Sequence, residues 1–346
     1  MQQRRPTARA STVPSSTVQR YRRRPQATRR DWIIAGSIAL LLLISTILLL
    51  TIPRLRSAAS RPGDIGAQAG AAAPTGGTAA VRAHAPFLEW DYVWGLAHPA
   101  AGAPRAQARS ELMVDLDSRH VLYAHDPKVR LPMASTTKLM TAIVALDNAS
   151  LDTVVSVPAD ATKVEPDHMG LSAGERVRVG DLLFGLLLDS GNDAAETLAM
   201  TTFESREAFI QAMNDKADAL GLQDSHFANP SGLDDPAQYS TAQDLALIAA
   251  YIYQHYPAIE QVVTTKTQGI TGNSDHKAFF PTNFNKLLSS YPGTIGFKTG
   301  QTDNAGTCLV TGAKRGNRTL LLVELNDPMI FTNATTMLNY GFQRPD

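Results

Sequence analysis

Short hydrophobic runs separated by polar turn residues predict strands at the beginning and the end of residues 111–325. Residues 111–115 and 121–124 flank a short polar turn, a pattern typical of an antiparallel hairpin. Residues 307–311 and 319–325 are separated by a glycine-containing turn and predict a second hairpin. We expect the two hairpins to belong to one antiparallel sheet.

The chain between the two hairpins has mainly helical patterning. Apolar residues recur with helical spacing in 139–146, 182–188 and 194–200, and a helix over 245–252 follows the capping residue Thr241. Strands at both ends with helices inserted between them predict an α/β fold of the α+β type. We expect an antiparallel sheet packed by helices, with an additional helical subdomain and with the first and last strands adjacent.

The first 86 residues differ in composition from the rest. Residues 1–30 hold nine arginines and no acidic residue, whereas residues 32–52 are uncharged and about as long as a helix that crosses a bilayer. Ala, Gly and Pro dominate residues 53–86, as in flexible linkers. We therefore expect four parts: a basic cytoplasmic tail (1–31), one transmembrane helix acting as a signal anchor (32–52), a linker (53–86) and a globular domain (87–346).

The distribution of charge orients these parts and excludes one class of partner. Arginines before residue 32 place the N-terminus in the cytoplasm by the positive-inside bias, and the globular domain outside the cell membrane. A cleaved signal peptide remains the alternative, because small residues occupy 57–60. Residues 31–346 carry 23 basic and 32 acidic residues, which argues against nucleic acid as a partner. The only cysteine, Cys308, is interpreted as a buried strand thiol.

Three short motifs follow one another in the globular domain, and their order matters more than each motif alone. Ser135-Thr136-Thr137-Lys138 precedes an apolar helical run, Ser190-Gly191-Asn192 interrupts two helical stretches, and Lys298-Thr299-Gly300 precedes the last hairpin. A second Ser-x-x-Lys at Ser274–Lys277 lacks such a context and shows how weak one motif is by itself. The ordered set indicates acyl transfer through a covalent serine ester.

The first motif supplies a nucleophile and a base. Ser135 needs a group that removes its proton, and Lys138 lies one helical turn further on the same face. Lysine is a base only when neutral, so we expect burial or a nearby cation such as Lys298 to disfavour its charge. Without the other motifs, Ser135 would be read as a helix N-cap and Lys138 as a surface lysine.

The other two motifs provide proton transfer and substrate binding. We assign Ser190 as a proton shuttle to the leaving amine and Asn192 as a hydrogen-bond partner of the substrate amide. Lys298 and Thr299, predicted on an edge strand, suit a substrate carboxylate, and Gly300 permits close approach of a substrate backbone. The backbone N–H groups of Ser135 and Gln301 are candidates for an oxyanion hole.

Other chemistries find little support. The eight histidines form no H-E-x-x-H pair, Pro166 separates Glu165 from His168, and no metal or other cofactor is expected. A G-x-S-x-G nucleophile elbow is absent as well.

The sequence resembles the D-alanyl-D-alanine carboxypeptidases, which are low-molecular-mass penicillin-binding proteins related to serine β-lactamases. The similarity extends beyond the three motifs to residues 132–138, 226–234, 239–242, 283–288 and 296–300. It implies a β-lactamase-like or DD-peptidase-like catalytic domain that removes the terminal D-alanine from peptidoglycan stem peptides and that β-lactams acylate on the same serine. Many relatives also carry an arginine at the start of the last helix that helps to bind the terminal carboxylate, and residues 328–333 contain none.

Two alternatives stay open. A class A β-lactamase has similar motif spacing but would need a deacylating glutamate after the second motif, and residues 226–233 offer none. A membrane-tethered wall-binding protein without activity is the other alternative, although all motif residues are intact.

Overall fold

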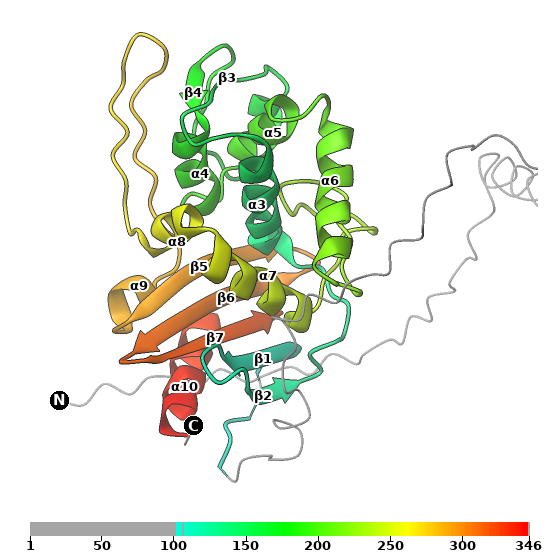
Figure 1. Cartoon of the computed structure of the whole chain (residues 1–346), viewed down its shortest axis with the longest axis vertical. Coiled ribbons are helices and arrows are strands. Elements are labelled where there is room, and N and C mark those ends of the chain that lie inside the picture. Colours follow the sequence, from blue (N-terminus) through cyan, green and yellow to red (C-terminus); the bar gives the residue numbers. More distant parts are fainter. Residues whose placement is uncertain (1–101, 106, 345–346) are drawn as a thin grey trace, which may run out of the picture. The chain divides into compact units, whose positions relative to one another are not determined.

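A five-stranded antiparallel sheet forms the framework of the computed structural model, which describes residues 102–105 and 107–344 (Figure 1). The order of strands across the sheet is β2-β1-β7-β6-β5. The strand bounds are β1 Ser110–Asp115, β2 Val121–His125, β5 Thr294–Thr302, β6 Gly306–Arg315 and β7 Arg318–Leu325.

Both predicted hairpins are present, and the ends of the domain meet. β1 pairs with β2 and β6 pairs with β7, each in antiparallel register. β1 also pairs with β7, with Leu112 opposite Val323, so the first and last hairpins are adjacent as predicted. β5 lies at the edge of the sheet, which confirms the edge position expected for the third motif. The short apolar runs bounded by turn residues therefore located the two hairpins correctly.

The two faces of the sheet are buried under different helices. Residues such as Met113 and Leu322 pack beneath α10 (Ile330–Gln343), together with Leu338 of that helix. Their strand neighbours Leu112 and Val323 point to the opposite face, because side chains alternate across a strand, and join the larger core. That core includes α7 (Ala242–His255) and α8 (Pro257–Thr264), which Figure 1 shows on the face of the sheet away from α10.

A helical region, placed above the sheet in Figure 1, lies between β2 and α7 in the chain. The predicted helices are present, and Thr241 caps α7 as expected by accepting a hydrogen bond from the Asp244 backbone N–H (3.0 Å). A small two-stranded antiparallel sheet of β3 and β4 is added to this region. The bounds are η2 Ala134–Thr137, α3 Lys138–Asn148, β3 Val154–Ser156, η3 Ala161–Lys163, β4 Arg176–Arg178, α4 Val179–Leu187, α5 Asn192–Thr201 and α6 Arg206–Ala219.

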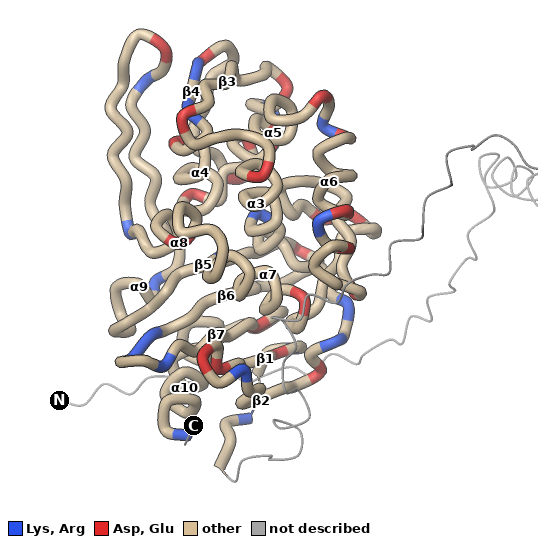
Figure 2. Tube along the Cα trace, viewed as in Figure 1, with Lys and Arg blue, Asp and Glu red and all other residues tan. Residues whose placement is uncertain are grey.

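A long two-stranded ribbon leads from α8 back to the sheet. Residues 265–286 run out and return, held by bridges between Thr267 and Thr282 and between Ile270 and Phe279. The short helix α9 (Leu287–Ser290) follows and leads into β5. Figure 2 shows charged residues mostly in loops and at strand ends, with the middle of the sheet largely uncharged.

The predicted tail, transmembrane helix and linker, together with residues 87–101 of the globular domain, lie outside the described residues. Among the helices within residues 102–105 and 107–344, none is long and apolar enough to cross a membrane.

Candidate active site

The nucleophile and the lysine of the first motif lie at the junction of a tight turn and a helix. Ser135 is in the 3₁₀ turn η2, and Lys138 is the first residue of α3. Because side chains three residues apart overlie one another in a 3₁₀ turn, the two side chains meet, and Lys138 Nζ lies 2.9 Å from Ser135 Oγ. The sequence placed both on one α-helical face, whereas the structure uses this tighter turn.

Lys138 is completely buried and is held from three sides. Besides Ser135 Oγ, its Nζ contacts Asn192 Oδ1 at 2.8 Å and the Ser231 carbonyl oxygen at 2.5 Å. Burial lowers the pKa of Lys138 well below its usual value, and the nearby charge of Lys298 lowers it further, against the opposing effect of Asp167. A lysine with a lowered pKa is available in its neutral form to accept the Ser135 proton, as the sequence reasoning required.

A polar turn outside the three motifs sets the position of the Ser231 carbonyl. Asn229 Oδ1 accepts hydrogen bonds from the backbone N–H groups of Ser231 (3.2 Å) and Gly232 (2.7 Å). Gln238 fixes this turn to η2, because its Oε1 accepts from the Asn229 N–H and its Nε2 donates to Thr137 Oγ1. The turn therefore belongs to the site. From the sequence it had no assigned role, and only the similarity of residues 226–234 to the resembled family was noted.

Gly232 brings this turn into direct contact with the nucleophile's backbone. Its φ of +89° is a conformation that side chains rarely adopt, and a Cβ there would overlap the Ala134 carbonyl and lie 2.9 Å from the Ser135 nitrogen. Ala134 itself has φ +49°. The segment before Ser135 is thus held in an uncommon backbone conformation by close packing.

The second motif turns the chain sharply between α4 and α5. Ser190 adopts φ +60° and Asn192 begins α5. The side chain of Asn192 bridges two parts of the site, since Oδ1 accepts from Lys138 and Nδ2 donates to the Glu165 carbonyl oxygen (3.1 Å). Asn192 therefore holds Lys138 in place. The sequence had suggested only a substrate-binding role for this residue.

Lys298 lies beneath the site rather than on its surface. It is 1% exposed, and its Nζ donates to the Thr299 carbonyl oxygen at 2.8 Å. Burial lowers its pKa to about 7, partly opposed by Asp167. A register shift between Gly296 and Lys298 interrupts the pairing of β5 with β6 just before the motif.

Gly300 lets the third motif approach the first. A Cβ at this position would lie 2.8 Å from the Ser135 nitrogen and 2.9 Å from Ala134 Cβ. Such distances are shorter than real Cβ contacts, so only glycine allows β5 to pass this close to η2. The glycine of the motif therefore brings the strand to the nucleophile itself, in addition to leaving room for substrate.

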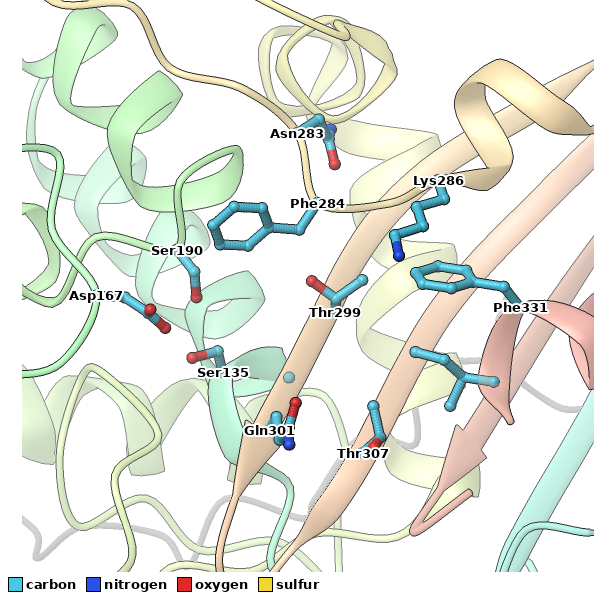
Figure 3. A pocket seen from close by; sticks show the side chains of 12 residues that line it. Ser135, Asp167, Ser190, Asn283, Phe284, Lys286, Thr299, Gln301, Thr307 and Phe331 are labelled. Atoms are coloured by element: carbon cyan, nitrogen blue, oxygen red, sulfur yellow. The ribbon is translucent and has the colours of Figure 1, made fainter. Parts of the chain in front are cut away.

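Two cavities meet at Ser135. The first, of about 430 Å³, is lined by Ser190, Thr299 and Gly300, whose motifs are distant in sequence, and Figure 3 shows Ser190 and Ser135 facing this space. The second, of about 650 Å³, is lined by Asn192, Gly232 and Leu233 among others. Ser135, Asp167 and Gln301 line both cavities.

The two cavities differ in charge. The first contains Lys286 besides Asp167, while the charged residues lining the second are all acidic: Asp167, Asp234 and Asp303. Lys286 extends from the returning arm of the ribbon, and its Nζ lies 5.6 Å from the centre of the Phe331 ring, which lines the same cavity (Figure 3). From the sequence, Asp167 had no assigned role and Lys286 was included only within the block 283–288, since both lie in segments without periodicity.

The remaining candidates lie elsewhere in the described part of the chain. Lys277 of the second Ser-x-x-K contacts Ser172 Oγ (2.6 Å) and Glu175 (3.7 Å) at the outer end of the ribbon. Cys308 is buried in β6, and burial raises the pKa of its thiol to about 11. The prediction of a buried strand thiol is therefore confirmed.

Comparison with known proteins agrees with this geometry. Residues 97–329 match the family model described as D-alanyl-D-alanine carboxypeptidase. The chain is 35% identical to D-alanyl-D-alanine carboxypeptidase DacF of Bacillus subtilis, over 69% of this chain and 63% of that protein. It is 37% identical to DacB2 of Mycobacterium tuberculosis, over 69% of this chain and 84% of that protein.

Solved structures show the same relationship. The Streptomyces K15 DD-transpeptidase superimposes with a TM-score of 0.66 at 34% identity, covering 70% of this chain and all of that one. A crystal structure of D-alanyl-D-alanine carboxypeptidase from Mycobacterium tuberculosis gives the same TM-score and identity, with 71% and 95% coverage. The fold predicted for the globular domain is therefore confirmed. With the family model matching most of the chain, the protein belongs to the D-alanyl-D-alanine carboxypeptidase family of serine peptidases.

Proposed function

We propose that this protein removes the terminal D-alanine from peptidoglycan stem peptides through an acyl-enzyme on Ser135, and that penicillins acylate the same serine. The observation that carries the proposal is the contact of 2.9 Å between a fully buried lysine, whose pKa is lowered, and a serine hydroxyl that opens onto two cavities. A neutral lysine next to a hydroxyl is the arrangement that nucleophilic catalysis by serine needs.

The charges of the two cavities orient the substrate. The peptide ends in a carboxylate, which suits the first cavity because Lys286 and the Thr299 hydroxyl lie there and the Lys298 ammonium lies directly below. The acyl part of the peptide then extends into the second, acidic cavity beside Asn192. In this orientation Ser190 lies on the side of the leaving amine.

Acylation follows from these positions. Lys138 takes the proton of Ser135 as Oγ attacks the carbonyl carbon of the terminal peptide bond, and that proton reaches the leaving nitrogen through Ser190. The backbone N–H groups of Ser135 and Gln301, two residues common to both cavities, stabilise the oxyanion.

The location of the reaction is part of the proposal. Residues 32–52 form a signal anchor, residues 1–31 remain in the cytoplasm, and residues 53–86 hold the catalytic domain outside the cell membrane. About 34 linker residues have an r.m.s. span of roughly 30–35 Å, so the site reaches peptidoglycan near the membrane surface.

Intact-mass analysis of the full-length chain incubated with penicillin tests the reaction. We expect a stable adduct of one penicillin, absent from the Ser135→Ala variant, together with release of D-alanine from a peptide ending in D-alanyl-D-alanine. Fast loss of the drug without an adduct would favour a β-lactamase. An unmodified chain and intact drug would instead support a non-catalytic wall-binding protein.

The acceptor of the acyl group is a second part of the question, because a solved relative is named a DD-transpeptidase. We propose that water is the main acceptor. Product analysis in the presence of an amine acceptor would reveal transpeptidation as a new peptide bond.

A further inference from the structure

One carboxylate outside the three motifs borders the nucleophile. Asp167 lines both cavities, a property it shares only with Ser135 and Gln301 among the residues that line the two. Figure 3 shows its carboxylate directed toward the space in front of Ser135 and Ser190. A molecule bound to the Ser135 ester from either cavity therefore meets Asp167.

The loop that carries Asp167 is firmly held. The Asp167 carbonyl oxygen accepts a hydrogen bond from the Asn192 N–H at 2.7 Å, at the first residue of α5. The fully buried carboxylate of Asp193 accepts from the three successive N–H groups of Met169 (2.8 Å), Gly170 (2.9 Å) and Leu171 (2.9 Å). These hydrogen bonds hold the loop on both sides of His168 and thereby fix the position of Asp167.

The carboxylate of Asp167 itself is not used by the fold. Within the described residues no hydrogen bond or ion pair to a protein donor engages its side-chain oxygens, and the side chain is half-buried at the cavity wall. By contrast, Asp234, the neighbouring acid of the second cavity, accepts from Thr302 Oγ1 (2.6 Å) and the Asn304 N–H (3.1 Å). Asp167 is thus free to accept a proton or a hydrogen bond from a bound molecule.

Lys138 is poorly placed to activate a water molecule. Its Nζ is enclosed by Ser135 Oγ, Asn192 Oδ1 and the Ser231 carbonyl, and the residue is 0% exposed. Once Ser135 carries an acyl group, water reaches the ester from the cavities, on the side that Asp167 borders. Acylation of Ser135 therefore takes place next to Lys138, whereas a water molecule that attacks the acyl-enzyme from the cavities lies next to Asp167.

We propose that Asp167 is the general base of the hydrolytic step, an inference that rests on the proposed acyl-enzyme. The oxygen of a water molecule forms a bond to the acyl carbon while its proton moves to the Asp167 carboxylate. The tetrahedral intermediate then collapses, the bond between the acyl carbon and Ser135 Oγ breaks, and Oγ takes the proton from Asp167. The products are a free Ser135 hydroxyl, an ionised Asp167 and the shortened peptide acid.

A depsipeptide ending in D-alanyl-D-lactate separates this step from acylation. Its ester is cleaved readily, so hydrolysis of the acyl-enzyme limits kcat while kcat/KM reports acylation. For the full-length Asp167→Asn variant we expect kcat to fall by roughly 10²–10⁴-fold, the usual contribution of a general base, with kcat/KM within about threefold of the wild type. Acyl-enzyme should accumulate and be visible by intact mass.

Asp160→Asn is the matched control, because Asp160 precedes the same loop, is largely exposed and forms a surface ion pair with Lys163 (2.7 Å). It should leave both parameters unchanged, while Asp167→Glu, which keeps a carboxylate, should recover part of kcat. An unchanged kcat in Asp167→Asn would overturn the proposal. An equal loss of kcat and kcat/KM would overturn it too, because the charge would then act on Lys138 and Lys298. Failure of the wild type to form any acyl-enzyme would refute the proposed function instead.

Discussion

The contact of Gly232 with the backbone before Ser135 allows a test of how tightly the nucleophile is positioned. In a Gly232→Ala variant the new methyl group would overlap the Ala134 carbonyl, and Ala134 and Ser135 belong to the turn that carries the reacting hydroxyl. Relief requires a movement on the order of 1 Å, and misplacement of that size at a reacting group costs about 10²-fold in rate. We therefore expect penicillin acylation to slow by about 10²-fold.

A matched variant, Gly174→Ala, separates the effect of the backbone conformation from the effect of the steric overlap. Gly174 has φ +85°, close to the +89° of Gly232, but a Cβ there meets nothing within 4 Å. Both variants should lose roughly 1–3 kcal/mol of unfolding free energy from the unfavourable φ. Only Gly232→Ala should also lose acylation rate, measured by quenching and intact mass. Equal acylation rates in the two variants would refute the idea that this packing positions Ser135.

Three further predictions concern charge. Lys138→Ala should slow acylation by roughly 10²–10⁴-fold, because it removes the base; a variant that acylates at the wild-type rate would contradict this role. Lys286→Ala should raise KM for a D-alanyl-D-alanine peptide by about tenfold, the effect of losing one charged contact, and should not change KM for the corresponding C-terminal amide. Burial, reinforced by Asp327, raises the pKa of Glu111 from 4.5 to about 8. The raised pKa means that the folded state retains a proton that the unfolded state releases, so the unfolding free energy should fall as pH rises from about 5 to about 8. Urea unfolding of Glu111→Gln should show a smaller fall, and identical pH dependence in both proteins would disprove this assignment.

Local patterns account for much of what was predictable. Short apolar runs bounded by turn residues located β1, β2, β6 and β7, because helices cover both faces of the sheet and leave few polar positions in its strands. The helical spacing after Ser135 located α3. The motif residues were identified because their chemistry depends on side chains at short, fixed separations. The expected roles of Lys298 and Gly300 required only that β5 be an edge strand next to the nucleophile.

Other parts of the site had no comparable signal. The Ser231 carbonyl contacts Lys138 through a backbone atom, so the identity of residue 231 does not reveal it. Asp167 and Lys286 reach the cavities through an irregular loop and a long ribbon, whose paths depend on contacts such as those of Asp193. The transmembrane helix over residues 32–52 stays a prediction.

Cys308 gives the chain a built-in reporter of sheet opening. It is the only cysteine, it lies in the strand next to β5, and its buried thiol, with a pKa raised to about 11, reacts with alkylating reagents only when the sheet opens. The rate of thiol labelling therefore measures the opening of the strands behind the nucleophile, without an introduced label. Gly300, which touches the backbone of Ser135, pairs directly with Cys308 across the two strands. Comparing that rate before and after penicillin acylation would therefore show how far a covalent bond at Ser135 restrains the sheet beside it.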